Sequence, residues 1–235
     1  NNLNLKIMRN NKNKLSNFQF WMPDPKKLSI SLVNFIELLK LLGFYLFKHS
    51  EGKPYVQLKD NILSAVTSGD IKKTVQKHIN ETLDPKVLLP HSKLSLKEVL
   101  IRSVKANSFS TYEYLPTFNS PTLRDTRDAC FLTFNNCYVE ITKDNIKVNK
   151  HQNLPFPVWD NQIINRDFIK IKGNSKKSEW EQFIEDVCNG EADRIKALKC
   201  TIGYLIHTYK NPSDCKITVF LDEQIGDMDE EHGGT

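Results

Sequence analysis

Apolar and polar positions alternate with clear periodicities between residues 28 and 83. A first helix is predicted by apolar residues at helical spacing, namely Leu32, Phe35, Ile36, Leu39 and Leu42. Ser29 or Ser31 is placed to cap this helix, and Gly43 is placed to end it. Short strands follow over residues 44–48, 55–58 and 62–67, and Ser68 is predicted to cap a second helix. The order αβββα predicts a small α+β module over residues 28–83.

The middle of the chain has two different patterns. Residues 84–121 read as a helical segment followed by a linker, and the prolines at 116 and 121 enclose the irregular end of that stretch. Residues 122–172 return to strand character, with strands predicted over 130–134, 138–142 and 145–148. Turns at Asn135-Asn136 and at residues 143–145 join these strands. The sequence therefore predicts a β-rich element after the linker.

Residues 173–212 predict two amphipathic helices. Ser178 and Glu181 have the spacing of a capping box, and Asn189-Gly190 ends the first helix. The first helix carries one apolar stripe, formed by Trp180, Phe183, Ile184 and Val187. The second helix is predicted over residues 192–209 with its apolar side inward, at Ile195, Leu198, Ile202, Leu205, Ile206 and Tyr209. Helices joined by so short a link pack antiparallel, so we expect a mainly structural C-terminal helical pair.

The chain begins with a basic, Asn/Lys-rich stretch, residues 1–27, which we expect to be a disordered tail. Its aromatic residues, Phe18, Phe20 and Trp21, could stack on bases. A hydrophobic latch onto the neighbouring module is the interpretation that we favour, because such aromatic residues more often pack against a neighbouring domain than bind bases.

The last stretch, residues 213–235, combines an apolar run with an acidic loop and a Gly-rich ending. Residues 217–221 read as a short buried strand, and Gly233, Gly234 and Thr235 follow the loop. A buried strand that leads into a Gly-rich turn is typical of a phosphate-binding loop, because glycines let backbone N–H groups approach phosphates. A flexible tail is the other interpretation of the glycines.

Residues 180–235 resemble the segment just before the Walker A loop of superfamily 3 primase-helicases, in particular the poxvirus-type branch of phages and mobile elements. The resemblance is carried by Ile202-Gly203-Tyr204-Leu205-Ile206-His207, by Tyr209-Lys210-Asn211-Pro212 and by the Gly-Gly-Thr ending. Phe134-Asn135-Asn136-Cys137 resembles the family's strand–turn–strand element. The resemblance covers the second half of the chain clearly and the first half only vaguely.

The resemblance implies a replicative helicase that acts as a hexamer on single-stranded DNA with ATP and Mg²⁺. Gly233, Gly234 and Thr235 would be the first half of the nucleotide-binding phosphate loop, and Asp222 and Glu223 would lie near the nucleotide. The sequence departs from the family in two ways: Glu231 stands where the loop's first Gly is expected, and the catalytic Lys does not occur. We therefore expect a pre-motor fragment of a longer protein that binds no cofactor and does not itself hydrolyse ATP.

The run Thr218 to Glu223 also looks like a Walker B motif, in which a strand ends on an Asp for Mg²⁺. In this chain the acidic pair comes before the glycines rather than after them, so we assign the run to the first strand of a P-loop ATPase core. The full prediction is an α+β chain in which a small αβββα module, a β-rich element and a helical pair lead into that strand.

The distribution of charge adds a candidate partner. The net charge is +5, and a basic cluster after the β-rich element contains Arg166, Lys170, Lys172, Lys176 and Lys177. Basic segments favour polyanions through counterion release, so these residues are candidates for binding DNA, single-stranded DNA above all. An ordinary solvated surface is the alternative. Lys53 and Lys59, near the hairpin of the small module, suit DNA or protein contact equally.

Other chemistry is weakly represented. The five cysteines are widely spaced and show no metal-ligand rhythm, and no signal peptide or membrane-length apolar run occurs. We expect no metal, no membrane contact and a cytoplasmic location in a bacterium or a phage host. His78 and His207 are expected to be satisfied side chains on helices, and residues 124–128 an exposed, self-paired turn. A non-enzymatic module of a mobile-element protein that binds DNA or protein remains the alternative function.

Overall fold

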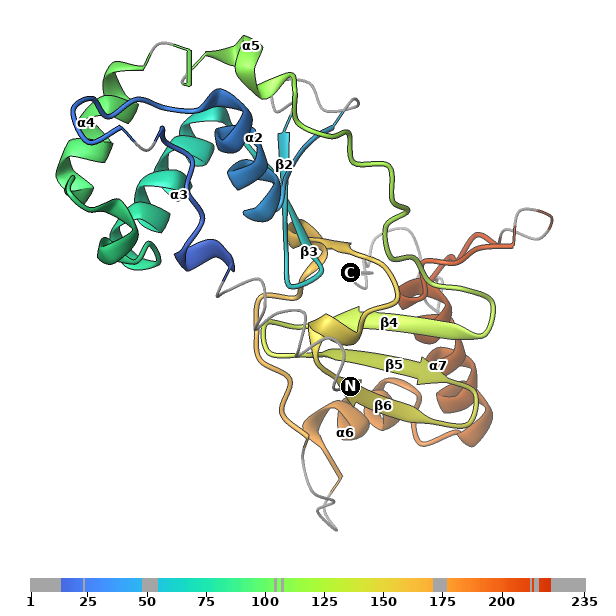
Figure 1. Ribbon diagram of the computed structural model, residues 1–235. Helices are drawn as coiled ribbons and strands as arrows, with labels where there is room; N and C mark the ends of the chain where they lie inside the picture. Colours follow the sequence, from blue (N-terminus) through green and yellow to red (C-terminus); the bar gives the residue numbers. More distant parts are fainter. Residues whose placement is uncertain are drawn as a thin grey trace, which may run out of the picture. The chain divides into compact units, whose positions relative to one another are not determined.

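The computed structural model describes residues 14–22, 24–47, 55–103, 105–106, 108–170, 177–211, 213 and 216–220. It is a mixed α+β structure, as predicted (Figure 1). The chain divides into two compact units. The first unit comprises residues 1–123, 132–139 and 148–168, and the second comprises residues 124–131, 140–147 and 169–235.

The predicted αβββα order is present in the first unit. Its elements are α2 (Leu32–Leu41), β1 (Phe44–Leu46), β2 (Tyr55–Lys59), β3 (Ile62–Val66) and α3 (Ser68–Glu81). The strands are antiparallel neighbours in that order, and the late strand β7 (Val158–Trp159) adds parallel to β3, with Ile62 opposite Val158. Helix α2 contacts β1, and α3 contacts β3. The pattern around residue 158 did not predict this fourth position in the sheet.

The ends of the two helices are fixed by local chemistry. Ser31 caps α2, and Gly43 follows it with φ +83°. A Cβ atom on Gly43 would lie 2.2 Å from the Leu58 carbonyl oxygen, so the position excludes every other residue on space as well as on backbone angle. Helix α3 is capped by Thr67, which forms a capping box with Asp70. The prediction of Ser68 as the cap was wrong, because Ser68 is already the first helical residue.

The β2–β3 hairpin turns on two residues with positive φ, Asp60 at 52° and Asn61 at 63°. Two such residues between paired strands are typical of a type I′ turn. The Asn61 side-chain amide donates to the carbonyl oxygens of His151 at 3.2 Å and of Leu154 at 3.4 Å. The hairpin tip therefore holds the segment that runs from η2 (His151–Asn153) into β7.

The core of the first unit includes the predicted aromatic latch. Phe20 and Trp21 are buried, with their rings edge to face at 5.3 Å, so the latch is confirmed. Residues 84–121 contain η1 (Pro85–Leu88), α4 (Lys93–Arg102) and α5 (Phe109–Tyr112). Tyr112 and Leu115 are buried in the same core, although their stretch was predicted to be a linker. The sequence did not predict this packing. Hydrophobic periodicity identifies the buried face of a helix or strand, but it cannot identify single apolar residues of an irregular stretch that are buried in the core.

The β-rich element is also confirmed. Its strands, β4 (Ala129–Thr133), β5 (Tyr138–Thr142) and β6 (Ile146–Asn149), are neighbours in that order. After β4, Phe134 pairs with Ile164, which follows the turn η3 (Asp160–Gln162). The His151 ring nitrogen Nε2 lies 2.8 Å from the Phe134 carbonyl oxygen and 3.1 Å from that of Cys137. His151 therefore has a structural role at the end of this sheet.

The C-terminal helical pair consists of α6 (Glu179–Val187) and α7 (Ala192–Ile206). The capping box is confirmed: Ser178 N–H donates to the Glu181 carboxylate at 2.9 Å, and Glu181 N–H donates to Ser178 Oγ at 3.2 Å. Asn189 and Gly190, both with positive φ, end α6 as predicted. Helix α7 ends at Ile206, which is three residues before the predicted end.

Burial in this pair differs from the prediction. Ile184 and Cys188 are buried, whereas no residue of α7 is fully buried. Apolar side chains expected to point inward are exposed, namely Trp180, Phe183, Val187, Leu205, Ile206 and Tyr209. The reason is geometric: two helices bury one line of contact between them, and an apolar stripe wider than that line stays exposed without a third layer.

The apolar run before the acidic loop was predicted to be a strand. Its described part, residues 217–220, is not a strand. Residues 216–220 have no strand pairing with any described residue, and Ile217 is 90% exposed. A strand is stabilised by a neighbour that satisfies its backbone groups, and the described residues supply none here. The hydroxyl of Tyr204 holds the start of the run, accepting from Lys216 N–H at 3.0 Å.

Candidate nucleic-acid interface

The predicted DNA-binding cluster is described only in part. Lys172 and Lys176 lie outside the described residues, and Arg166, Lys170 and Lys177 are exposed. Lys177 pairs with the Glu185 carboxylate at 2.7 Å, so part of its charge is compensated within the chain. The cluster was predicted from charge alone. In the structure its described members differ in their contacts with other residues.

Arg166 has the best-defined of these settings. Its guanidinium lies over the Phe134 ring, 5.9 Å from the ring centroid. The Asn135-Asn136 turn positions the segment that carries Arg166: Asn135 N–H donates to the Arg166 carbonyl oxygen at 3.1 Å. Asn136 exchanges two hydrogen bonds with the Phe168 backbone, at 3.0 and 2.9 Å. An exposed Arg over an aromatic ring offers both a charge and a flat surface to a nucleic acid.

The structure shows a second basic region, which we did not predict from the sequence. Residues 71–106, which include most of α3, all of α4 and the link between them, form what we call the basic helical segment. It contains eight basic residues, Lys72, Lys73, Lys77, Lys86, Lys93, Lys97, Arg102 and Lys105. It has only three acidic residues, so its net charge of +5 equals that of the entire chain. A sum of charge along the predicted helices would have revealed it.

The folding of α3 explains why its charges face solvent. Ile71, Val75 and Ile79 are buried, which places the intervening Lys72, Lys73 and Lys77 on the exposed side. Helix α4 contacts α3 and buries Leu96 and Leu100. Lys93 Nζ donates to the Asn80 carbonyl oxygen at 3.0 Å and so links the start of α4 to the end of α3. Two packed helices thus hold this positive charge on a rigid support.

His78 lies inside the basic helical segment and differs from expectation. It is buried, but neither ring nitrogen has a hydrogen-bond partner among the described residues. Burial lowers the pKa of His78 below its ordinary value, and the nearby Lys93 charge lowers it further. The ring is therefore neutral at pH 7, and the prediction that it is satisfied was wrong.

Asp125 also has a role that the sequence did not predict. Its carboxylate accepts from Phe131 N–H at 2.7 Å and from Thr208 N–H and Oγ1, both at 2.8 Å. Burial acts to raise the pKa of Asp125, but these hydrogen bonds outweigh it and hold the pKa below its ordinary value. The charged turn at 124–128 is thus held by backbone and hydroxyl donors, rather than by the self-pairing we expected.

The predicted nucleotide site lies outside the described residues. This applies to Gly233, Gly234 and Thr235 and to the acidic pair Asp222 and Glu223. Among the residues that the structure does describe, no group of His, Cys, Asp and Glu side chains could hold a metal ion. In the same part of the chain, every helix is too short or too polar to cross a bilayer.

Comparison with known proteins does not assign this chain to a family. No protein-family model matches the chain, and neither the curated proteins nor the solved structures contain a significant match. The interpretation of function therefore rests on the residues of this chain and on their arrangement.

Proposed function

We propose that this chain is the pre-motor segment of a replicative DNA helicase or primase-helicase of a phage or mobile element. In this role it engages single-stranded DNA and joins neighbouring copies, while ATP and Mg²⁺ act in a motor that is not in this chain. The observation that carries the proposal is the basic helical segment, whose net charge of +5 equals that of the entire chain and most of whose basic residues lie on two packed helices. The resemblance of residues 180–235 to primase-helicases supplies the family context.

The basic helical segment suits a phosphate backbone for a physical reason. Exposed lysines on a rigid helix neutralise phosphates and release condensed counterions, which is the main source of affinity independent of sequence. Lys72, Lys73 and Lys77 lie on exposed positions of one helix. Arg166 over Phe134 adds a contact of a different type, because a base can stack on such a surface.

Assembly with other copies is supported by the C-terminal helical pair. Trp180 and Phe183 are exposed and stack at 5.6 Å, forming the start of an apolar face. Helix α6 has acidic but no basic residues, whereas α7 carries Arg194, Lys196 and Lys199. A second copy placed antiparallel would bring α6 against α7 with opposite charges and bury the apolar face. In the parent protein such contacts would contribute to a hexamer.

The second candidate function is a non-enzymatic module that binds DNA or another protein. The exposed apolar face of α6 and α7 favours it, because a large exposed apolar patch marks an interaction site whatever the partner. This candidate shares DNA engagement with the first and differs in having no motor. A Gly-Lys-Ser/Thr encoded directly after Thr235 would favour the first candidate, since it would complete a phosphate loop.

A charge-matched pair of variants tests DNA engagement. One variant changes Lys72, Lys73, Lys77 and Lys97 to Gln, and the control changes the exposed Lys26, Lys27, Lys143 and Lys147 to Gln. Both lose four positive charges, so a difference between them reports position rather than net charge. We expect the first variant to bind a fluorescent single-stranded oligonucleotide at least tenfold more weakly than the control. Equal affinities would show that the basic helical segment is ordinary surface.

A further inference from the structure

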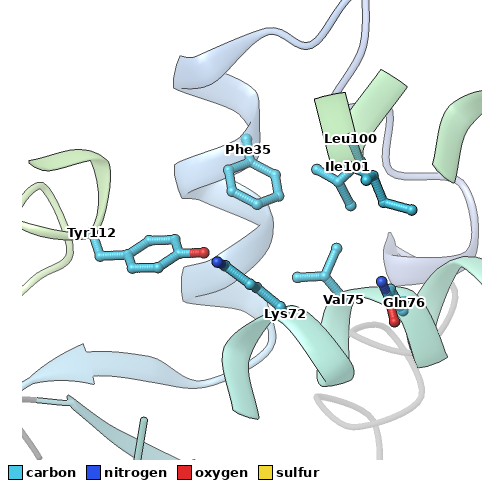
Figure 2. Close-up of a pocket in the computed structure, with 7 residues that line it drawn as sticks. All are labelled: Phe35, Lys72, Val75, Gln76, Leu100, Ile101 and Tyr112. Carbon is cyan, nitrogen blue, oxygen red and sulfur yellow. The ribbon is translucent and has the colours of Figure 1, made fainter. Parts of the chain in front are cut away.

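The first unit contains a cavity of about 230 Å³ between its helices. Its lining comes from α2, α3, α4 and α5, namely Phe35, Lys72, Val75, Gln76, Leu100, Ile101 and Tyr112 (Figure 2). Phe35, Val75 and Leu100 are buried and form apolar walls. Lys72, Gln76 and Ile101 are exposed, so the cavity opens to solvent along the basic helical segment.

Tyr112 makes this cavity more than a packing defect. Its side chain is fully buried, and its hydroxyl has no hydrogen-bond partner among the described residues. Figure 2 shows the hydroxyl pointing into the space between Lys72 and Phe35. A buried hydroxyl without a partner is costly and rare in folded proteins, so the Tyr112 hydroxyl is available to a polar group that enters the cavity. Burial raises the pKa of Tyr112 to about 12, which keeps the hydroxyl protonated and able to donate.

We propose that this cavity binds one unstacked base of a single-stranded DNA, with the Tyr112 hydroxyl donating to an acceptor atom of the base. The inference rests on the proposed function. Phe35 and Val75 would contact the apolar faces of the ring, and the Gln76 amide would lie at its polar edge. Lys72 stands at the opening, where the phosphate attached to that base would be.

The size of the cavity favours a single base over a larger ligand. Pockets for drug-sized molecules have volumes of roughly 300–1,000 Å³, and this cavity, at about 230 Å³, is smaller. Proteins commonly recognise single strands in this way, by taking an unstacked base onto an aromatic or apolar surface and bonding its edge. The cavity has one charged residue, Lys72, and that residue belongs to the basic helical segment, so the cavity and the proposed path of the phosphates meet.

The test compares an oligonucleotide of thymidines with an abasic strand of the same length and charge, using the full chain. Tyr112→Phe removes only the hydroxyl, and the exposed Tyr114→Phe is its matched control. We expect Tyr112→Phe to reduce the preference for the thymidine strand about fivefold, which is the effect of one neutral hydrogen bond. Binding of the abasic strand should not change.

The stability of the free protein gives a second measurement. The urea midpoint of Tyr112→Phe should be higher than that of the wild type, because an unpartnered buried hydroxyl has been removed. Tyr114→Phe should change none of these values.

Two results would overturn the inference in different ways. A preference that stays the same in Tyr112→Phe, with DNA binding retained, would show that no base enters the cavity and would leave the proposed function standing. Absence of binding to both strands by the wild type would contradict the proposed function as well. Should Tyr112→Phe fail to fold, Gln76→Leu on the exposed side of α3 decides: a smaller preference supports a bound base, and an unchanged preference excludes it.

Discussion

Lys93 Nζ donates a hydrogen bond to the Asn80 carbonyl oxygen across 3.0 Å, which joins the first turn of α4 to the last turn of α3. A cation at the carboxyl end of a helix also interacts favourably with the helix dipole. Burial lowers the pKa of His78, and the same ammonium group lowers it further. Lys93 thus links the two helices of the basic helical segment and adds to the effect of burial on His78.

His78 predicts how the stability of the first unit depends on pH. Its pKa in the folded chain lies below the ordinary value of 6.5, so the unfolded chain binds more protons as the pH falls. By linkage the free energy of unfolding is unaffected by His78 above pH 6.5 and decreases as the pH falls below that value. Urea unfolding between pH 8 and pH 5 measures this effect. His78→Leu should flatten the pH dependence, whereas His91→Gln should retain it; an equal slope in the wild type and in His78→Leu would refute the assignment.

Gly43→Ala tests the junction between α2 and β1. The new Cβ atom would lie 2.2 Å from the Leu58 carbonyl oxygen, and the backbone angle of φ +83° is strained for alanine. We expect a loss of about 2–4 kcal/mol in the free energy of unfolding, since strain and a backbone clash act together. Gly69→Ala is the control, because its Cβ would make only ordinary contact with Thr67 Oγ1 at 3.5 Å. Urea melts of both variants should differ clearly, and similar melts would mean that the junction is not as described.

Asp125 predicts an effect in the second unit. Asp125→Asn weakens its bonds to Phe131 and Thr208, and we expect a loss of about 1–2 kcal/mol, since the site is only partly buried. The folded pKa is below the ordinary 3.8, so the stabilisation is present above that value and is lost as the pH falls through the folded pKa. Thermal melts at pH 7 and at acid pH measure both effects. Asp128→Asn, at an exposed position, is the control and should melt like the wild type.

The apolar face of the C-terminal helical pair predicts self-association. Replacing Trp180 and Phe183 by Ser removes the exposed, stacked ring pair while leaving the capping box of α6 intact. We expect the wild type to sediment as an oligomer that dissociates at low concentration, and the double variant to sediment as a monomer. Val33→Ser, at an exposed position of α2, should leave the oligomer unchanged. A monomeric wild type at all concentrations would contradict self-association through this face.

Local signals in the sequence predicted most of the elements. Hydrophobic periodicity indicated α2, α3, α6 and α7, and turn chemistry at Asn189-Gly190 predicted where α6 ends. The long-range features could not be predicted in this way. The pairing of β7 with β3 and the binding of Asp125 to Thr208 join residues distant in sequence, and no periodicity records such partners.

In the candidate site, too, features made by neighbouring residues could be predicted, and features made by residues far apart in the sequence could not. The basic cluster around Lys170 was visible as neighbouring letters, whereas the basic helical segment was hidden because its charges are spread among apolar core residues. The cavity at Tyr112 combines side chains from α2, α3, α4 and α5, so only a folded structure brings them together. Burial in the C-terminal pair was predicted wrongly, because periodicity identifies an apolar face without showing what covers it.

The most direct test of the central claim is the salt dependence of single-stranded DNA binding by the full chain, followed by fluorescence anisotropy. If the basic helical segment contacts phosphates, the logarithm of the association constant for single-stranded DNA falls linearly with log[salt], with a slope of about −0.7 for each phosphate neutralised. Changing Lys72, Lys73, Lys77 and Lys97 to Gln should then make the slope clearly shallower, and neutralising Lys170, Lys172, Lys176 and Lys177 tests the second cluster in the same way. Absence of binding at low salt, or an affinity independent of salt, would contradict DNA engagement.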